Sequence, residues 1–436
     1  RYHFVGYVAK LGPWTIYHSG ATIPYDGMEE ILRQWEIDVA LLPINGRHPE
    51  RRVAGNLWGR EAARLAKSIN AGTVIPCHYE MFEFNTESPD EFEAECQALC
   101  QAAEPLPLPE STPWDVAALK KAPKFERIRQ EGDVQALLYA GEKYRSKPTR
   151  VFAYYASPRT LGQAVKGKVP GIVLVHGGGG TAFANWAQLW AKRGYAAIAM
   201  DLAGCGEGRK RLADGGPGQS HADKFSTIDE PLENQWSYHA VANVIRGHSL
   251  LRSFAGVDGD RVALTGISWG GYLTCIVAGV DDRFAMAMPV YGCGFLRENS
   301  VWKVSEFGKM TAAQSDKWHR LWDPSRYIGS AKMPVMFLNG TNDFAYPMDS
   351  YAKTCALVRS EKNYSIQLNM KHGHLFEFPE FFLFVDQYIR GGKPMPVVAR
   401  PVIDGGKVRT SVKSETKLIE AKLHYTTAPH EQNRSR

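Results

Sequence analysis

A serine set between two glycines, in the pentapeptide Gly266-Ile267-Ser268-Trp269-Gly270, is the feature that most limits what this chain can fold into. The residues before it, 261–265, have the apolar character of a buried strand, and a helical pattern begins just after Ser268. A chain that passes from strand to helix in so few residues has to turn sharply, and larger side chains at the glycine positions would clash with neighbouring backbone. The pattern therefore predicts a serine hydroxyl presented at the carboxyl end of a strand and the amino end of a helix.

Strand and helix patterns alternate on both sides of this turn, between residues 116 and 398. The continuous apolar runs 171–175 and 195–200 are typical of strands that are buried on both faces of a parallel sheet. Further strands are expected at 151–155, 261–265, 285–290, 334–338 and 365–370, and helices at 183–193, 236–254, 349–359 and 379–390. This alternation predicts an α/β fold with a doubly wound, mostly parallel sheet.

Two long segments, 202–235 and 293–330, interrupt the alternation, and the second is rich in Trp and Phe. Loops of that length inside a compact domain usually have a function. We therefore expect both segments to be cap inserts that border a partly apolar cleft.

Composition divides the 436 residues into four parts. Residues 1–103 alternate short strands and helices on a smaller scale, and the proline-rich segment 104–115 follows them. Several prolines in so few residues favour extended backbone, so this segment is expected to be a linker. Residues 116–398 then form the larger domain, and 399–436 form a tail with strand-like pieces and a polar end.

Charge and hydropathy exclude several classes of protein. The net charge of +6 is spread along the chain without a block of Lys or Arg, which argues against a nucleic-acid partner. No apolar run is long enough to cross a membrane, and the N-terminal residues do not have the pattern of a signal peptide. Seven cysteines without regular spacing do not form a disulfide framework. We therefore expect no membrane association and take the cytoplasm as the default location.

A glycine-rich loop, His176-Gly177-Gly178-Gly179-Gly180, follows the predicted strand 171–175. It lacks the Lys-Ser/Thr pair of a P-loop and the spaced glycines of a dinucleotide site, which makes a phosphate cradle the weaker interpretation. Bare backbone amides at such a place can stabilise a negative oxygen that develops during acyl transfer. The expected donors of this oxyanion hole are the amides of Gly178 or Gly179, together with the amide of Trp269.

An acid is expected at Asp343, which follows the predicted strand 334–338. A solvated turn aspartate is the alternative interpretation of this residue. Asp201, after strand 195–200, is a competitor, but it precedes Ser268. Proteins with this type of serine turn have the chain order serine, acid, histidine, so Asp343 is the better candidate.

Two histidines, His372 and His374, follow the predicted strand 365–370 and compete for the role of general base. A histidine takes the proton of the serine and later returns it to the leaving group, while a carboxylate fixes its tautomer. His374 is favoured because the loop before it is long enough to fold back over the edge of the sheet, whereas His372 is expected to form a local hydrogen bond. The predicted catalytic triad is Ser268, Asp343 and His374, and no cofactor or metal is expected.

Residues 120–398 resemble the α/β-hydrolase superfamily. They are most similar to its acetylxylan-esterase and dienelactone-hydrolase-like branch, which borders on the prolyl-oligopeptidase-type hydrolases. The stretches Leu174–Gly179, Gly266–Gly271 and Phe337–Asp343 carry the resemblance. It implies a serine carboxylesterase that cleaves small carboxylic esters, often acetyl groups on sugars, through an acyl-enzyme intermediate. A serine peptidase that uses the same triad is the alternative, and it ranks lower because no propeller or second substrate domain is evident.

Residues 1–103 resemble the C-terminal half of a metallo-β-lactamase-fold protein similar to L-ascorbate-6-phosphate lactonase. The likeness rests on Ile16–Gly20, Leu41–Arg47 and Ile75–Tyr79. The metal-binding His-x-His-x-Asp-His cluster of that family is absent, Ala21 stands where a bridging aspartate is expected, and only His78 matches a ligand position. The resemblance implies a degenerate half-domain that packs, caps or forms a homo-oligomer. A metal-dependent lactonase completed by a partner chain is the alternative, and a catalytically silent scaffold is a third hypothesis. The tail resembles the start of a β-sandwich.

Overall fold

The computed structural model divides into two compact units, residues 1–104 and 105–436. It describes residues 6–12, 14–52, 55–80, 82–101, 105–109, 112–129, 132–374, 378–399, 401–404, 407–422 and 424. Each unit has its own buried apolar core. The boundary falls in the proline-rich segment that was expected to be a linker.

The N-terminal unit is a small αβ unit around a four-stranded sheet in the order β1-β2-β3-β4. Its strands are β1 (Tyr7–Leu11), β2 (Trp14–His18), β3 (Val39–Pro43) and β4 (Thr73–Cys77), and its helices are α1 (Met28–Leu32), α2 (Gly59–Ser68) and α3 (Asp90–Gln101). The strands β2, β3 and β4 run parallel, and β1 is antiparallel to β2. At the start of helix α2, Glu61 accepts the amide of Trp58 at 2.9 Å and forms an ion pair with Arg47. This ion pair supports the unit in addition to its apolar core.

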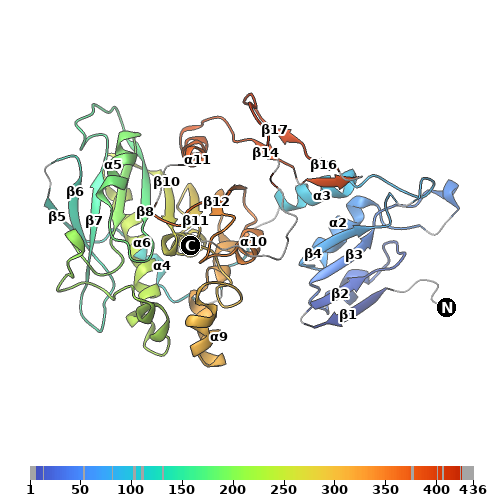
Figure 1. The fold of residues 1–436 in the computed structure, drawn as a ribbon, viewed down its shortest axis with the longest axis horizontal. Helices are drawn as coiled ribbons and strands as arrows, with labels where there is room; N and C mark the ends of the chain where they lie inside the picture. The colour runs from blue at the N-terminus through green and yellow to red at the C-terminus, as the bar shows by residue number, and fades with distance from the viewer. Residues whose placement is uncertain are drawn as a thin grey trace. The chain divides into compact units, whose positions relative to one another are not determined.

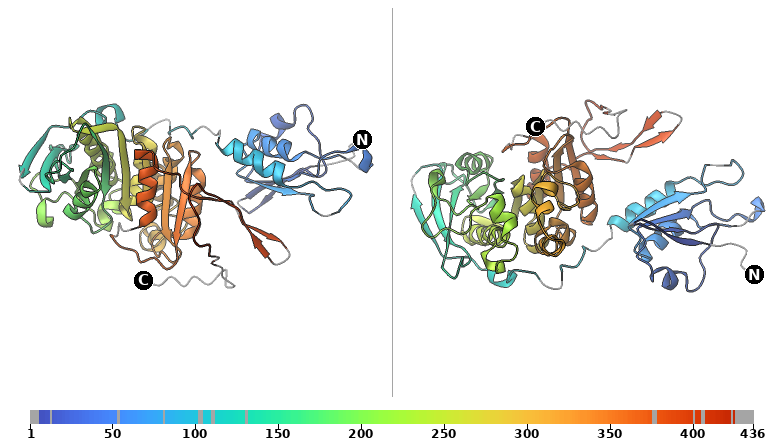
Figure 2. Two further views of the ribbon diagram at one scale, coloured as in Figure 1. Left: turned by 90° about the horizontal axis from the view of Figure 1, so that it is seen from above. Right: turned by 60° about the horizontal axis from the view of Figure 1, so that its bottom comes forward.

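The larger unit contains a nine-stranded sheet in the order β13-β12-β11-β10-β8-β9-β7-β6-β5 (Figure 1, Figure 2). Its strands are β5 (Phe125–Arg129), β6 (Gln135–Ala140), β7 (Arg150–Ala156), β8 (Val169–Val175), β9 (Ala196–Met200), β10 (Val257–Ile267), β11 (Met286–Val290), β12 (Val335–Gly340) and β13 (Lys362–Gln367). The strands from β8 to β13 are parallel, and β7, β6 and β5 continue the sheet in antiparallel fashion. The predicted α/β fold with a doubly wound, mostly parallel sheet is confirmed.

Helices cover both faces of this sheet. They are α4 (Val116–Leu119), α5 (Ala184–Lys192), α6 (Trp236–Ser253), α7 (Trp269–Val280), α8 (Trp302–Ser305), α9 (Ala312–Trp322), α10 (Met348–Leu357) and α11 (Pro379–Arg390). Gly171 of β8 pairs with Val262 of β10, and a side chain at Gly171 would contact Val262 and Leu251 of α6. Arg261, the residue before Val262 on β10, instead donates to a carbonyl of α11. Since neighbouring residues of a strand point to opposite faces, α6 and α11 lie on opposite sides of the sheet.

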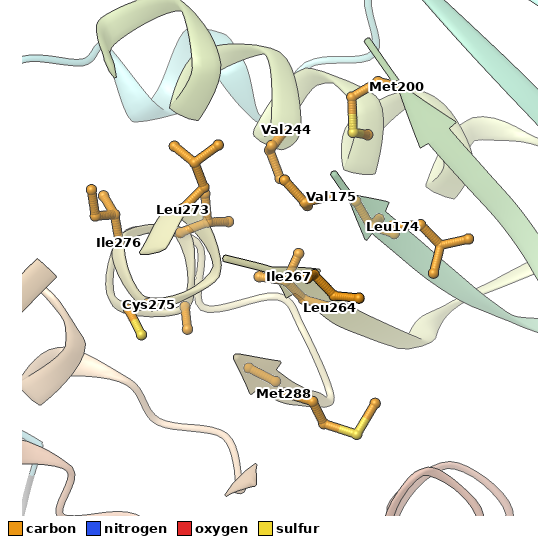
Figure 3. Close-up of a cluster of buried hydrophobic side chains, with 14 of the residues drawn as sticks. Leu174, Val175, Met200, Val244, Leu264, Ile267, Leu273, Cys275, Ile276 and Met288 are labelled. Carbon is orange, nitrogen blue, oxygen red and sulfur yellow. The ribbon is translucent and has the colours of Figure 1, made fainter. Parts of the chain in front are cut away.

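The core around the serine turn is formed by β8, β9, β10 and β11 against α6 and α7. Figure 3 shows its side chains, among them Leu174, Leu264, Met288, Val244 and Leu273. All of these side chains are buried. The turn that carries Ser268 is therefore built on a densely packed base, which fixes its position.

Three features of this unit differ from the expected elements or extend them. Strands β5 and β6 were not among the expected elements. The sequence of β5, Phe-Glu-Arg-Ile-Arg, belongs to a largely exposed edge strand. Strand β13 ends at Gln367, three residues before the predicted end at 370. The described part of the tail forms two small antiparallel sheets, β14 (Val397–Val398) with β17 (Val412–Lys413) and β15 (Val402–Asp404) with β16 (Lys407–Arg409), while residues 425–436 lie outside the described residues.

The two inserts fold as short helical turns at the carboxyl edge of the sheet. Segment 293–330 contains α8 and α9, and its Trp302, Phe307, Trp318 and Trp322 are all buried. The aromatic side chains of this insert are thus part of the core of the larger unit. Among the described residues, no helix is both long enough and apolar enough to span a membrane.

Candidate active site

Ser268 occupies the sharp turn between β10 and α7. Its φ of 59° and ψ of −117° are a strained conformation for a residue with a side chain. A Cβ atom on Gly266 would lie 2.3 Å from the carbonyl oxygen of Gly270, and one on Gly270 would lie 2.2 Å from that of Val175. Both glycines are therefore required by close backbone approach, which is the reason that the sequence pattern suggested.

Replacing Gly270 by Ala is expected to destabilise the larger unit, because the added Cβ atom would force β8 and α7 apart. Overpacking of this kind lowers the free energy of unfolding by about 3 kcal/mol. In a domain of this size that corresponds to a fall in Tm of roughly 10 °C. Gly308→Ala is the matched control, since its Cβ atom would be an ordinary 3.6 Å from the carbonyl oxygen of Lys303. Thermal melts that show equal Tm values for the two variants would contradict the close contact at Gly270.

A serine, a histidine and an aspartate form a hydrogen-bonded line at this turn. The Ser268 Oγ lies 2.9 Å from Nε2 of His372, and Nδ1 of His372 lies 2.7 Å from Oδ2 of Asp343. A carboxylate can only accept, so Nδ1 carries the proton and Nε2 is free to accept the proton of the serine. The imidazole stacks on Tyr291 at 4.4 Å between ring centroids, which holds it in plane with the line.

The expected base, His374, is not in this line, and this part of the sequence prediction is wrong. Its Nε2 accepts the amide of Gly177 at 3.2 Å, and its ring lies against Phe183 at 5.2 Å. The reason is the early end of β13. Because the strand stops at Gln367, the loop has enough residues to reach back over the sheet edge already at His372. The expected local role of His372 is therefore filled by His374.

Asp343 is buried, with 4% of its surface exposed, and the hydrogen bonds of its carboxylate fix its orientation toward His372. Its Oδ1 accepts the amides of Ala345 and Tyr346, at 2.9 and 2.7 Å, which leaves Oδ2 for His372. The competing Asp201 instead accepts the amides of Ala203 and Cys205 and shapes the loop after β9. The chain-order argument therefore selected the aspartate that bonds the histidine.

The glycine-rich loop passes directly over the serine. A Cβ atom on Gly177 would lie 3.1 Å from the Cβ atom of Ser268, and one on Gly178 would lie 2.7 Å from the Trp269 ring. The Trp269 amide is the first of α7 and has no acceptor within the helix. The glycine-rich loop and the start of α7 therefore lie beside Ser268, and the amides of Gly178 or Gly179 and of Trp269 remain the expected oxyanion donors.

Two histidines hold the glycine-rich loop at Gly177. His374 accepts its amide, and Nδ1 of His176 donates to its carbonyl oxygen at 2.8 Å, since Nε2 of His176 accepts the amide of Leu202. Burial lowers the pKa of His176 to about 4, so this imidazole stays neutral and keeps the tautomer that the loop needs. Burial and the neighbouring His372 also lower the pKa of His374.

The first insert completes the support of this loop. Arg209 donates to the carbonyl oxygen of Gly179, and Gln219 donates to that of Gly180 at 2.9 Å. Sequence reasoning missed both residues, because a polar side chain that bonds a distant backbone carbonyl leaves no local pattern. The insert 202–235 therefore fixes the backbone on which the expected oxyanion donors lie.

Aromatic rings from both inserts surround Trp269. Its ring centroid lies 4.7 Å from that of Trp302 and 5.7 Å from that of Phe225. Ser268 itself keeps 8% of its surface exposed. The residue that follows the nucleophile is thus packed among buried aromatic rings of both inserts.

The N-terminal unit does not offer a metal site within its described residues. No group of three His, Cys, Asp or Glu side chains in the described part of the chain could hold an ion. His78, the ligand position that matches, lies in the turn after β4, and the ring nitrogen of His18 accepts the amide of Gly20. The donor set of a binuclear centre does not fit this unit, and no reaction step is assigned to it.

The fold and the hydrogen-bonded line of Ser268, His372 and Asp343 define an enzyme with a serine hydrolase fold. The comparisons with known proteins place the larger unit in the same class. Residues 181–382 match the model of the prolyl oligopeptidase family.

Solved structures with this fold include two acetyl xylan esterases. The enzyme from Paenibacillus sp. R4 is 20% identical with a TM-score of 0.53, and the match covers 67% of this chain and 99% of that chain. The enzyme from Thermoanaerobacterium sp. JW/SL YS485 is 18% identical with a TM-score of 0.50, covering 67% and 97%. These likenesses show that the larger unit has the α/β-hydrolase fold.

The N-terminal region is similar to UPF0173 metal-dependent hydrolases, which have the metallo-β-lactamase fold. It is 37% identical over 101 residues to the protein of Myxococcus xanthus, covering 23% of this chain and 33% of that protein. It is 40% identical over 88 residues to the protein of Caldivirga maquilingensis, covering 20% and 36%. The chain spans about a third to two fifths of the length of the curated relatives it matches. The expected resemblance of residues 1–103 is confirmed.

Proposed function

We propose that this protein is a serine carboxylesterase that hydrolyses small carboxylic esters through an acyl-enzyme intermediate. The single observation that carries the proposal is the line from Ser268 Oγ through His372 to Asp343, at 2.9 and 2.7 Å. In this mechanism Nε2 of His372 takes the serine proton while Oγ bonds to the ester carbonyl carbon. The carbonyl oxygen becomes negative and accepts the amides of Trp269 and of Gly178 or Gly179.

The tetrahedral intermediate then collapses. The bond to the leaving oxygen breaks, and His372 gives its proton to the leaving alcohol. A water molecule next loses a proton to His372 and attacks the acyl carbon, which releases the carboxylic acid and restores the Ser268 hydroxyl. Asp343 keeps its charge throughout and stabilises the imidazolium form of His372.

Two features support an ester over a peptide as the substrate. Ser268 is only 8% exposed, and the ring of the following residue, Trp269, packs against Trp302 of the second insert, which favours a small acyl group. Two esterases are also among the structures that share the fold. A serine peptidase that uses the same three residues is the second candidate, because the matching family model is that of the prolyl oligopeptidases.

A matched pair of substrates separates the two candidates. We expect the enzyme to release acetate from an alkyl acetate and from an acetylated oligosaccharide, and to leave the peptide bonds of short N-acylated peptides uncleaved. Acetate release and peptide cleavage are measured with the same preparation. Hydrolysis of a short peptide at a rate equal to that of the ester would favour the peptidase.

A further inference from the structure

One buried hydroxyl beside the serine has no part in the mechanism given above. Tyr346 is fully buried, with 0% of its surface exposed, and its Oη makes no hydrogen bond of normal geometry within the described part of the chain. Leaving a buried hydroxyl unpaired is unfavourable, and such groups are rare in native structures unless they serve a purpose. Although burial raises the pKa of this phenol, the Ser268 hydroxyl is close enough to oppose the rise through a side-chain hydrogen bond, so an oxygen bonded at Ser268 is the partner that the Tyr346 hydroxyl can reach.

The backbone of Tyr346 is fixed to the same carboxylate that orients the histidine. Its amide donates to Oδ1 of Asp343 at 2.7 Å, and its carbonyl oxygen accepts from the Asn339 side chain at 3.1 Å. The backbone of Tyr346 is thus bonded to Asn339 at the end of β12 and to Asp343 in the loop that follows. This is the rigid support that a group acting on a reacting atom needs.

The ring of Tyr346 lies near two rings of the site, the His372 imidazole and Trp302. It is nearly parallel to the His372 imidazole, at 10° with 6.3 Å between the ring centroids, and it meets the Trp302 ring edge-on at 5.2 Å. Trp302 in turn contacts Trp269, the residue that follows the nucleophile. The Tyr346 ring therefore lies near the imidazole of the triad and contacts Trp302, which packs on Trp269.

The Tyr346 hydroxyl is a neutral donor under all ordinary conditions. Burial raises its pKa well above the usual value, the neighbouring Cys293 and Asp343 add to the rise, and a side-chain hydrogen bond with Ser268 opposes it. A phenol that keeps its proton can donate a hydrogen bond but does not act as a base at neutral pH.

Resting on the proposed function, we propose that Tyr346 is a further catalytic residue, whose Oη donates a hydrogen bond to the substrate oxygens of the tetrahedral intermediate on Ser268. No proton leaves the phenol in this step. The proton of Ser268 goes to His372, the new bond forms between Oγ and the carbonyl carbon, and the electron pair of the carbonyl bond moves to oxygen. The donor is already in place and already desolvated, so its hydrogen bond becomes stronger as negative charge develops on the intermediate.

Replacing Tyr346 by Phe tests this role, because the variant removes one oxygen atom and keeps the ring. We expect kcat/KM for a short-chain aryl ester to fall by about two orders of magnitude with KM changed little. The Tm should stay level or rise, since the hydroxyl that is lost is buried and unpaired. Phenylboronic acid, which forms a tetrahedral adduct with a serine hydroxyl, should bind the variant more weakly by a similar factor.

Tyr139→Phe is the matched control. Tyr139 is also fully buried, but its hydroxyl donates to the carbonyl oxygen of Asn243 at 2.7 Å, on strand β6 far from the serine in the sheet order. This control should lose stability and keep its kcat/KM. A Tyr346→Phe enzyme within about twofold of the wild-type kcat/KM, or one with unchanged boronate affinity, overturns the proposal.

Ser268→Ala separates this inference from the proposed function. If Ser268→Ala is inactive and Tyr346→Phe is fully active, only the role of Tyr346 is refuted. If Ser268→Ala retains its activity, the proposed function itself fails.

Discussion

Ser268→Ala is expected to lower kcat/KM for a short-chain aryl ester by three or more orders of magnitude. The variant keeps the fold but has no oxygen that can bond to the acyl carbon, so the acyl-enzyme route is lost. What activity remains comes from binding and from the oxyanion donors, which still act on water. Steady-state kinetics, with protein that shows an unchanged Tm, measures the effect.

A second serine serves as its control. Ser253 donates to the carbonyl oxygen of Leu250 near the end of α6, and Ser253→Ala should keep wild-type turnover. Turnover by Ser268→Ala within about tenfold of wild type would mean that another residue is the nucleophile.

The two histidines of the loop after β13 are expected to respond very differently to replacement by Ala. His372→Ala should lower kcat/KM by three or more orders of magnitude, because His372 is the imidazole that bonds both the Ser268 hydroxyl and the Asp343 carboxylate. His374→Ala removes one acceptor of the Gly177 amide, a bond that stabilises by about 1 kcal/mol, so a loss of about tenfold or less is expected.

Parallel kinetics on the two variants, with Tm values for each, makes the comparison. Since the two positions differ by only two residues and share one loop, each variant controls for general damage by the other. Inactive His374→Ala protein together with active His372→Ala protein would show that the loop rearranges during catalysis, and the assignment of the base would have to be reversed.

The fold of the larger unit could be predicted from its sequence, because the sequence patterns of its strands and of the serine turn are strong and local. Apolar runs such as 171–175 mark strands buried on both faces, and the glycines around Ser268 mark the turn. The serine and the aspartate follow from these elements, since both lie at the carboxyl ends of parallel strands. The edge strand β5 could not be predicted, because its charged, exposed residues do not differ from those of a loop.

The choice of the histidine could not be settled from the sequence, because it depends on where one strand ends. The polar residues of 362–367 form β13, whereas the more apolar 365–370 had been expected to do so. That shift of three residues decides which imidazole reaches Ser268 and which one bonds Gly177. The supports from Arg209 and Gln219, and the position of Tyr346, depend likewise on contacts between distant segments.

Trapping the acyl-enzyme is the most direct test of the central claim that Ser268 is the nucleophile of an ester hydrolase. The enzyme is mixed with excess p-nitrophenyl acetate, quenched in acid during turnover, digested and analysed by mass spectrometry. We expect acetyl on the peptide that contains Ser268 in the wild-type protein, and none on that peptide in Ser268→Ala. Turnover without an acetylated Ser268, or an acetyl group at another residue that forms and decays at the rate of turnover, would contradict the account.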